Sequence, residues 1–195
     1  MKRIFDIIFS FFGIIFLSPL LILIIFLMKV TSKGPVIYKQ VRVGRNNKDF
    51  SIFKFRTMFI DSDKFGLLTV GDRDPRVTSL GYYLRKFKLD ELPQLFNVLN
   101  GDMSFVGPRP EVRKYVDLYN NIQIQVLNVR PGITDLASIE FRNENELLSS
   151  QEDPDSYYIN VIMPKKIQIN LDYLKESNLF KDVWVIIKTF QVIVM

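Results

Sequence analysis

The stretch that decides the fold is an uncharged apolar run near the start of the chain, IIFSFFGIIFLSPLLILIIFLM, at residues 7–28. At a rise of about 1.5 Å per residue, a helix of this length is long enough to cross a hydrocarbon layer about 30 Å thick. The run therefore predicts a membrane helix. We expect residues 1–30 to form a membrane segment and residues 31–195 to form a separate domain.

A Ser-Pro pair in the middle of this run changes how the helix is expected to meet the membrane. Pro19 lacks a backbone N–H and clashes with the preceding turn, so it bends or breaks a helix. The hydroxyl of Ser18 offers a local partner to a backbone group that the proline leaves free. Ser18 and Pro19 therefore mark a point at which the segment can turn back.

The charges on both sides of the run favour a segment that returns to the side it came from. Lys2 and Arg3 precede the run and several basic residues follow it, and Lys and Arg collect on the cytoplasmic side of membranes. We therefore expect a re-entrant helical hairpin. A helix that crosses the membrane is the first alternative, and a signal peptide, with an apolar core of only about 7–15 residues, is the second. Asp6 is costly at depth, so we expect it at the interface, paired with a basic residue.

The composition limits the chemistry that the chain can perform. Its 195 residues include no His and no Cys, and 26 Lys and Arg against 21 Asp and Glu give a net charge of +5. Catalytic triads with histidine, cysteine nucleophiles, disulfides and zinc sites with nitrogen or sulfur ligands are therefore excluded. Catalysis would have to use carboxylates, hydroxyls, Lys, Arg and backbone groups, with an oxygen-binding metal such as Mg²⁺ if a metal takes part.

The rest of the chain predicts a small, mostly helical α+β domain. Two β-leaning runs, residues 36–38 and 50–53, flank a turn-rich stretch and predict a short hairpin. A loop is expected at residues 61–78, and helices are expected at residues 79–86, 90–100, 111–127, 154–176 and 179–194. The last helix is amphipathic, which fits either packing in the core or lying on a bilayer surface.

The densest group of polar signals is LDELPQLFNVLNGDMSFVGPRPE at residues 89–111. Asp90 and Glu91 stand at a predicted helix start, where acidic residues are common because they complement the helix dipole. Arginines surround this pair along the sequence, and a guanidinium binds phosphate oxygens through two parallel bonds. Pro108 and Pro110 fix the backbone on both sides of Arg109 and preorganise it. These residues together indicate a site for a diphosphate and a metal ion.

Three motifs resemble those of the bacterial sugar transferases, the small monotopic phosphoglycosyl transferases. The motifs are KFRTM at residues 54–58, LRKFKLDELPQLFNVLNGDMSFVGPRPE at residues 84–111, and VRPGIT at residues 129–134. The resemblance covers essentially the whole chain. It implies transfer of a sugar 1-phosphate from a UDP-sugar to a polyprenol phosphate (undecaprenyl phosphate), with release of UMP. This is the initiating step of surface glycan (capsule, O-antigen, exopolysaccharide) or glycoprotein synthesis, at the cytoplasmic face of the inner membrane.

The resemblance also implies a role for individual residues. Asp90 would be the nucleophile that forms an aspartyl-phosphosugar intermediate, with Mg²⁺ between its carboxylate and the diphosphate, and Glu91 would be its partner. The implied fold is a re-entrant membrane hairpin followed by a small cytoplasmic catalytic domain with a short β-hairpin and amphipathic helices at the interface. The residues implied to bind phosphate or nucleotide are Arg56, Arg85, Pro108, Arg109 and Pro110.

One stretch departs from the common pattern of this family. Many members continue GIT with GWAQ, whereas this chain has DLASIEFRNE at residues 135–144. Sugar specificity is therefore not transferred from relatives, although the acidic pair is unaffected.

Two other classes of function fit part of the sequence. A non-enzymatic protein bound to anionic lipid would account for the basic residues after the apolar run, at about 1 kcal/mol for each Lys or Arg at the surface, but not for the acidic pair or the Pro-Arg-Pro element. Nucleic-acid binding fits the positive net charge, but it does not fit an apolar run of this length. The expected partners are thus a UDP-sugar, a polyprenol phosphate and membrane lipid, and no nucleic acid.

Overall fold

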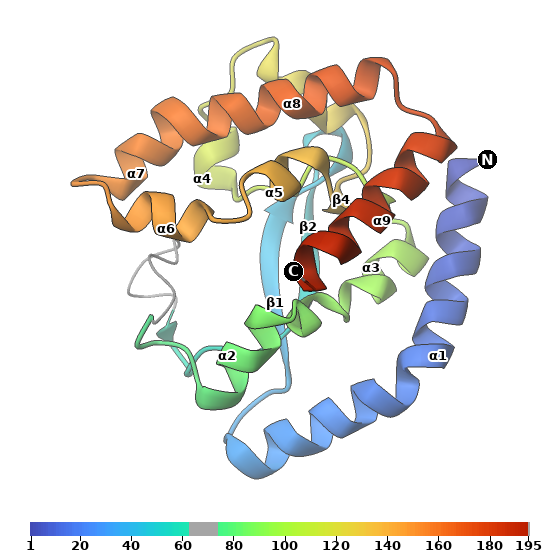
Figure 1. Cartoon of the computed structure of the whole chain (residues 1–195), viewed down its shortest axis with the longest axis vertical. Coiled ribbons are helices and arrows are strands. Elements are labelled where there is room, and N and C mark those ends of the chain that lie inside the picture. The colour runs from blue at the N-terminus through green and yellow to red at the C-terminus, as the bar shows by residue number, and fades with distance from the viewer. Residues whose placement is uncertain (63–73, 195) are drawn as a thin grey trace.

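The structure is a computed structural model, and it describes residues 1–62 and 74–194. Helices surround two small sheets, so the protein is α+β and mostly helical, as predicted (Figure 1). The strands are β1 (Ile37–Val43), β2 (Asp49–Phe55), β3 (Ser104–Val106) and β4 (Gly132–Thr134). The helices are α1 (Lys2–Thr31), α2 (Ser79–Lys86), α3 (Gln94–Asn100), α4 (Arg113–Val116), α5 (Leu136–Glu140), α6 (Glu144–Ser149), α7 (Pro154–Tyr157), α8 (Met163–Lys175) and α9 (Leu179–Val194).

Helix α1 is the long apolar helix that the sequence predicts, with Pro19 inside it and a bend near its middle (Figure 1). Because Pro19 has no N–H, the carbonyl of Ile15 loses its usual helical partner. The Ser18 hydroxyl donates to that carbonyl instead, at 2.7 Å, which confirms Ser18 as the local partner. The chain stays helical through the bend, so the two arms of the predicted hairpin are not seen as separate helices.

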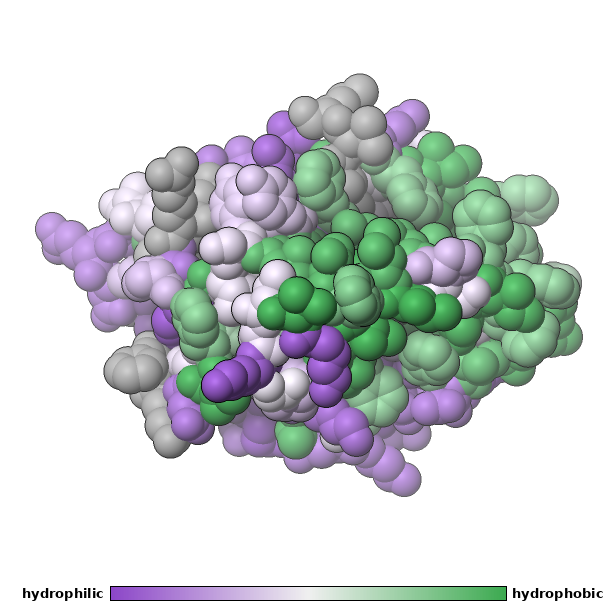
Figure 2. All heavy atoms as spheres, turned by 90° about the horizontal axis from the view of Figure 1, so that it is seen from below, coloured by the Kyte–Doolittle hydropathy of each residue, from purple (hydrophilic) through white to green (hydrophobic). Residues whose placement is uncertain are grey.

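Most of the apolar surface of α1 faces away from the protein. In its most hydrophobic 18-residue window, only 17% of the residues are buried inside the structure. Figure 2 looks onto the side where the second half of α1 lies and shows a broad hydrophobic area there. A helix in a soluble core would be mostly buried, so this area requires another apolar environment.

Polar contacts fix the first turn of α1 to the rest of the protein. Lys2 forms an ion pair with Asp182 of α9, 2.8 Å from Nζ to Oδ2, and also donates to the Val106 carbonyl at 2.8 Å. Arg3 donates to the carbonyl of Val98 near the end of α3, at 2.6 Å. The basic residues that were read as a membrane-side charge therefore dock on the protein itself.

Asp6 is buried inside the protein. Its side chain is 2% exposed and accepts hydrogen bonds from the Ser104 hydroxyl at 3.1 Å and from the Phe105 N–H at 3.2 Å. The prediction that Asp6 pairs with a basic residue is wrong, because Ser104 and Phe105 of β3 provide neutral donors to its carboxylate instead. The position of Asp6 at the membrane interface stays a prediction.

The predicted β-hairpin is confirmed: β1 continues to Val43 where a run ending at residue 38 was expected, and β2 extends beyond the expected residues 50–53 on both sides. β1 and β2 are antiparallel, with Ile37 opposite Phe55 and Val43 opposite Asp49. Phe55 packs in a cluster with Leu84 of α2 and with three residues from the second half of α1, which are Leu21, Ile24 and Met28. The hairpin therefore ties the C-terminal part of α1 to the domain.

A second, parallel sheet was not predicted from the sequence. β3 pairs with β4, with Ser104 opposite Gly132 and Val106 opposite Thr134. Each strand has only three residues, too few for an alternating pattern to show. A Cβ on Gly132 would lie 2.2 Å from the nitrogen of Gly107, so glycine is required where the two segments cross. This crossing brings the segments after β3 and β4 together, next to the candidate site.

The helix predictions succeed where local signals are strong. Thr78 caps α2 by accepting the N–H of Gly81 at 3.0 Å, and Gly101 ends α3 with a φ of +98°.

The predicted start at Asp90 is wrong, because Lys88 has a φ of +54° and residues Leu89–Glu91 form a 3-10 turn before α3. The helix expected at 111–127 is replaced by α4 and a 3-10 helix at Gln123–Asn128. A π-helical turn, Tyr158–Ile162, joins α7 to α8 in the next predicted helix. The loop expected at 61–78 lies mostly outside the described residues.

Helix α9 has two apolar faces. Val185 is fully buried and packs with Val106 of β3, whereas Phe180, Trp184 and Phe190 are 87%, 50% and 65% exposed. The sequence left core packing and surface exposure open, and the helix shows one face of each kind.

Candidate active site

The acidic pair lies in the 3-10 turn that joins α2 to α3. Lys88 enters this turn with left-handed backbone geometry and turns the chain sharply before Asp90 and Glu91. Asp90 is only 7% exposed, and 11% of the Glu91 side chain is exposed. The two neighbouring carboxylates are therefore both buried, and each needs compensation from its surroundings.

Glu91 receives that compensation from two cations. Arg109 directs both terminal nitrogens at it, with Nη1 at 3.4 Å from Oε2 and Nη2 on Oε1, and Lys54 Nζ lies 3.0 Å from Oε1. Burial alone would raise the pKa of Glu91, but the charges of Arg109 and Lys54 outweigh it and hold that pKa well below its usual range. Glu91 is thus ionised and keeps two positive groups at the site.

Asp90 is in a different situation, although it is the next residue. Its Oδ1 atom is buried and has no hydrogen-bond partner within the described part of the chain. Burial, followed by the negative charge of Glu91, raises the pKa of Asp90, while Lys54, Lys88 and Arg85 act in the opposite direction. A buried carboxylate oxygen without a partner is costly, and in native structures such groups concentrate at functional sites. Asp90 therefore offers a free oxygen to a ligand.

The backbone of Arg109 is held from the other side by Asp135. The Arg109 N–H donates to Asp135 Oδ2 at 2.8 Å, and Asn170 Nδ2 of α8 donates to the same oxygen at 3.1 Å. Asp135 also caps α5 by accepting the Ser138 N–H. One buried carboxylate thus connects the Pro-Arg-Pro element to two helices.

The two prolines beside Arg109 are also anchored through their carbonyls. Pro108 accepts the N–H of Gly132 at 3.1 Å, and Pro110 accepts a guanidinium N–H of Arg42 at 3.1 Å. The same Arg42 lies 3.2 Å from Glu111 Oε1, and the Tyr158 hydroxyl donates to the other oxygen of Glu111. The whole element is therefore rigid before any ligand binds, which is what a preorganised contact requires.

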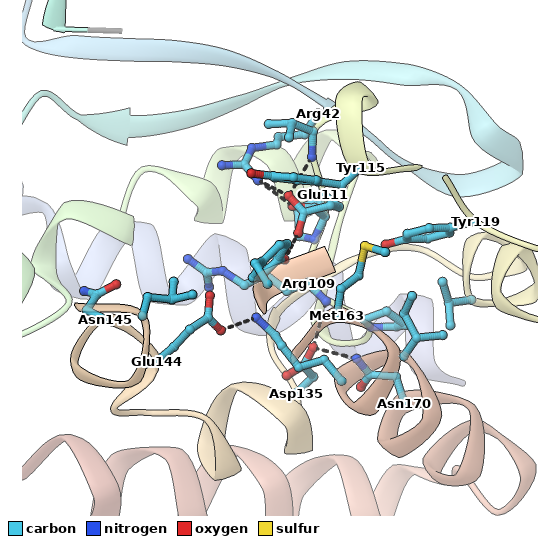
Figure 3. A pocket seen from close by; sticks show the side chains of 18 residues that line it. Arg42, Arg109, Glu111, Tyr115, Tyr119, Asp135, Glu144, Asn145, Met163 and Asn170 are labelled. Atoms are coloured by element: carbon cyan, nitrogen blue, oxygen red, sulfur yellow. Dashed lines mark hydrogen bonds and ion pairs between the residues drawn. The ribbon is translucent and has the colours of Figure 1, made fainter. Parts of the chain in front are cut away.

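A cavity of about 230 Å³ opens beside Arg109 (Figure 3). Its wall includes Asn145 and the ion pair between Glu144 of α6 and Lys166 of α8, in which Nζ lies 2.7 Å from Oε2. About a third of the Arg109 side chain, 35%, is exposed. Arg109 therefore contacts the acidic pair on one side and this cavity on the other.

The structure brings some of the predicted site residues together and leaves one apart. Asp90, Glu91 and the Pro-Arg-Pro element lie in one place, and Arg85 interacts electrostatically with Asp90 while its Nε donates to Thr57 at 2.9 Å. Arg56 instead donates to the Ser32 hydroxyl at 2.6 Å, just after the end of α1. In the described structure it therefore supports the link between α1 and the domain.

Several residues of the site were missed by sequence reasoning. Lys54 belongs to the KFRTM motif, but Arg56 was the residue of that motif named from the sequence, and its role in binding phosphate stays a prediction. Asp135, Arg42 and Lys166 carried no local signal, because each meets its partner through a contact that only the folded chain creates. Asp135 did stand in the stretch that departs from the family pattern, and that was the only clue to it.

The residues present fit a magnesium ion only in combination with a substrate. No group of three or more Asp, Glu, His or Cys side chains that could hold a metal is found among residues 1–62 and 74–194. Mg²⁺, however, is usually held by one or two carboxylates together with substrate phosphates. The partnerless Oδ1 of Asp90 is a suitable oxygen ligand for such an ion.

Comparison with known proteins gives concordant matches. The whole chain, residues 1–195, matches the family model described as bacterial sugar transferase. A UDP-N-acetylgalactosamine-undecaprenyl-phosphate N-acetylgalactosaminephosphotransferase from Aeromonas hydrophila is 40% identical over 195 residues, which cover 98% of this chain and 43% of that protein. A UDP-glucose:undecaprenyl-phosphate glucose-1-phosphate transferase from Klebsiella pneumoniae is 40% identical over 192 residues, which cover 96% of this chain and 39% of that protein.

A shorter relative matches over most of its length. The exopolysaccharide production protein ExoY from Rhizobium meliloti is 34% identical over 203 residues, which cover 96% of this chain and 83% of that protein. The chain thus spans about two fifths of the length of the first two relatives and most of the third.

Proposed function

The chain belongs to the bacterial sugar transferase family, and we propose that it transfers a sugar 1-phosphate from a UDP-sugar to undecaprenyl phosphate, with release of UMP. The names of two relatives include both a UDP-sugar and undecaprenyl phosphate. The observation that carries the proposal is the acidic pair, in which a partnerless Asp90 lies beside a Glu91 that gathers Arg109 and Lys54. By the same likeness, the reaction is proposed to initiate the synthesis of a surface glycan or glycoprotein.

Asp90 acts as the nucleophile in this proposal. Its carboxylate oxygen attacks the β-phosphorus of the donor, a carboxylate–phosphorus bond forms, and the bond from that phosphorus to the bridging oxygen breaks so that UMP leaves. In the second step a phosphate oxygen of undecaprenyl phosphate attacks the same phosphorus and releases the Asp90 carboxylate. The raised pKa of Asp90 increases its basicity, and the nearby cations favour its ionised form.

The cations of the site neutralise the charge of the diphosphate. Arg109 and Lys54 are held in place by Glu91, and Arg85 lies close enough to interact with Asp90. Fixed positive groups of this kind stabilise the charge that develops during phosphoryl transfer. We propose that Asp90 also holds Mg²⁺ together with the donor phosphates, and a bound Mg²⁺ would neutralise phosphate charge further.

The apolar surfaces support a position of this site at a membrane. The exposed face of α1 and the exposed face of α9 both require apolar cover, and a bilayer provides it for a protein whose acceptor is a lipid. Both ends of α1 contact the same domain, the first turn through Lys2 and Asp6 and the last turns through Ile24 and Met28. A helix that crosses the bilayer would have its ends on opposite sides. This supports a re-entrant course, with the catalytic domain on the cytoplasmic face.

The activity is tested directly with purified protein in detergent, supplied with Mg²⁺, undecaprenyl phosphate and a panel of UDP-sugars. We expect UMP release from at least one donor, and we expect Asp90→Asn to lower the rate by about 10³-fold or more, because the amide is not a nucleophile. The matched control is Asp172→Asn, an exposed carboxylate on α8 that pairs with Lys175. No UMP from any donor, or an Asp90→Asn rate near that of the unchanged protein, would contradict the proposal.

The covalent intermediate provides a second, positive test. With the donor present and undecaprenyl phosphate left out, a phosphosugar adduct should accumulate on the peptide that contains Asp90. Mass spectrometry of the digested protein would detect it. An adduct on another residue would move the nucleophile away from Asp90.

The membrane course is tested separately, and the absence of cysteine in the chain makes each introduced cysteine unique. Ile4→Cys and Lys33→Cys stand at opposite ends of α1, and both positions are accessible in the structure. A membrane-impermeant thiol reagent applied from the cytoplasmic side should label both variants. Labelling of the two positions from opposite sides would show a crossing helix instead.

A further inference from the structure

The cavity beside Arg109 is separate from the acidic pair and has a wall of its own. α6 provides Glu144 and Asn145, and α8 provides Lys166 and Asn170 (Figure 3). At about 230 Å³ it is smaller than the roughly 300–1,000 Å³ of a pocket that takes a drug-sized molecule. It therefore has room for one ring-sized group, and not for a whole nucleotide sugar.

The wall of the cavity offers both donors and acceptors of hydrogen bonds. Glu144 and Lys166 form an ion pair at its edge, and 22% and 15% of their side chains remain exposed. Asn170 is 5% exposed and donates through Nδ2 to Asp135, so its carbonyl oxygen Oδ1 is an acceptor. That oxygen is buried and has no partner within the described residues. A ligand that brings several hydroxyl or N–H donors would satisfy it.

The position of Arg109 shows which part of a donor this group would be. Arg109 touches Glu91, next to the nucleophile Asp90, and it also lines the cavity. In a UDP-sugar the sugar is bonded to the β-phosphate that Asp90 attacks, whereas the nucleoside is separated from that phosphorus by the α-phosphate. The group nearest to the reacting phosphorus on the far side of Arg109 is therefore the sugar.

We propose that this cavity holds the sugar ring of the donor, with Glu144, Asn145, Lys166 and Asn170 as the groups that read its hydroxyl or acetamido substituents. The inference rests on the proposed function and deepens it, because it assigns the choice of sugar to α6 and α8. A paired carboxylate and ammonium, together with two amides, are groups that hydrogen-bond a polyhydroxyl ring from several directions. The wall also includes Asp135 and Glu144, the two ends of the stretch in which this sequence departs from the family pattern.

The test compares two donors that differ only in the sugar. kcat/KM is measured with UDP-glucose and with UDP-N-acetylgalactosamine for the unchanged protein, for Glu144→Gln and for Asn145→Ala. Inhibition by UDP, which is the donor without its sugar, is measured in parallel. Lys175→Ala is the matched control, because Lys175 lies on α8 in an exposed ion pair with Asp172, away from the cavity.

We expect each cavity variant to change the ratio of the two kcat/KM values by about tenfold, since a hydrogen bond to one substituent is lost, and to leave the inhibition constant of UDP within twofold. If the unchanged protein uses only one of the two donors, its KM should rise by about tenfold in the variants. Lys175→Ala should change neither quantity. Asn145 is exposed, so Asn145→Ala is expected to keep its fold even if Glu144→Gln does not.

Two results would overturn the inference. If UDP inhibition weakens by about tenfold while the donor ratio stays constant, the cavity holds the nucleoside. If neither quantity changes, the cavity is not part of the donor site. In both cases the unchanged protein still releases UMP and the proposed function stands. If it releases no UMP from any donor, the proposed function fails first and the inference fails with it.

Discussion

Carboxylates are buried among basic residues in two regions of this molecule, the acidic pair and the first turn of α1. At the start of α1, Asp6 accepts hydrogen bonds from two neutral donors, and Asp182 of α9 pairs with Lys2 and accepts a hydrogen bond from the Tyr173 hydroxyl. At the acidic pair, Glu91 is bound as completely by Arg109 and Lys54, but Asp90 keeps a buried oxygen without a partner in the described structure. Glu91, Asp6 and Asp182 are thus each bound by cations or hydrogen-bond donors, whereas Asp90 keeps an oxygen available to a ligand.

The difference shows how a buried charge in a structural role is separated from one in a reactive role. Burial by itself is the same in both regions, since Asp6 and Asp90 are 2% and 7% exposed. The number of donors that reach each oxygen is what differs. Substitutions in the two regions should therefore have opposite consequences for stability and for activity. Three predictions test this contrast, and a fourth concerns the bend of α1.

The largest of these four effects is expected at Arg109, on activity. Arg109→Lys keeps the positive charge but cannot direct two nitrogens at Glu91, so the cations lose their fixed geometry. We expect kcat/KM for UMP release to fall by about 10²-fold. The control is Arg113→Lys, a guanidinium that also makes several contacts but at the exposed Asp49, where activity should stay within about twofold. Equal losses in the two variants would show that the geometry at Glu91 has no special role.

Removal of Asp6 is expected to act on stability instead. Asp6→Ala leaves the Ser104 hydroxyl and the Phe105 N–H buried without an acceptor, which costs about 1–3 kcal/mol. Thermal unfolding in detergent should show a lower Tm, while the folded fraction retains its rate of UMP release. Asp117→Asn, at an exposed carboxylate, serves as the control and should leave Tm unchanged. A loss of turnover with no change in Tm would remove the contrast between the two regions.

The same reasoning predicts that loss of the Asp90 carboxylate stabilises the protein. The pKa of Asp90 is raised in the fold, so its contribution to stability is complete below its unfolded pKa and is lost as the pH rises through the folded pKa. At neutral pH the buried Asp90 carboxylate lacks a partner, which lowers the free energy of unfolding. Asp90→Asn removes the charge and should raise the free energy of unfolding by about 1 kcal/mol, or the Tm by roughly 2–4 °C. The advantage should disappear below about pH 4, where the carboxyl is protonated in both states. A Tm at pH 7 below that of the unchanged protein would contradict this assignment.

The smallest effect is expected at the bend of α1. Ser18→Ala removes the hydrogen bond to the Ile15 carbonyl that replaces the one missing at Pro19, at a cost of about 0.5–1.5 kcal/mol. Ser10→Ala is the internal comparison, because its hydroxyl also donates to a carbonyl three residues earlier, at Ile7, but without a proline nearby. We expect the greater loss of Tm for Ser18→Ala. Equal losses of Tm would mean that the missing N–H of Pro19 makes the Ser18 hydrogen bond no more important than the one at Ser10.

Much of the fold follows from local patterns. The apolar run gives α1, two β-leaning runs around a turn-rich stretch give the hairpin, and local signals give the end of α3, because each of these signals lies within a few residues of its effect. The parallel pair of β3 and β4 could not be predicted in this way. Its strands are three residues long, and what selects them is a close crossing of Gly107 and Gly132.

The candidate site shows the same difference between residues that lie in one local motif and residues that meet only in the folded chain. Asp90, Glu91 and Arg109 lie within one continuous motif, so sequence reasoning identified them together. Lys54 reaches Glu91 across 37 positions in the chain, and Asn170 reaches Asp135 across 35. A pattern in a single sequence does not predict such long-range contacts, because they depend on how the helices pack.

The docking of the first turn of α1 has a consequence for how the chain is made. Lys2, Arg3 and Asp6 leave the ribosome early, but their partners Asp182, Val98 and Ser104 follow about 100 to 180 positions later. At about 5–20 residues per second, Lys2 waits roughly ten to forty seconds before Asp182 has been synthesised. During that time the helix is already apolar enough to enter a bilayer, while its own charged turn has nothing to bind. The helix can therefore meet a bilayer before the rest of the chain has been made, and the contacts of its first turn are complete only when α9 has been synthesised.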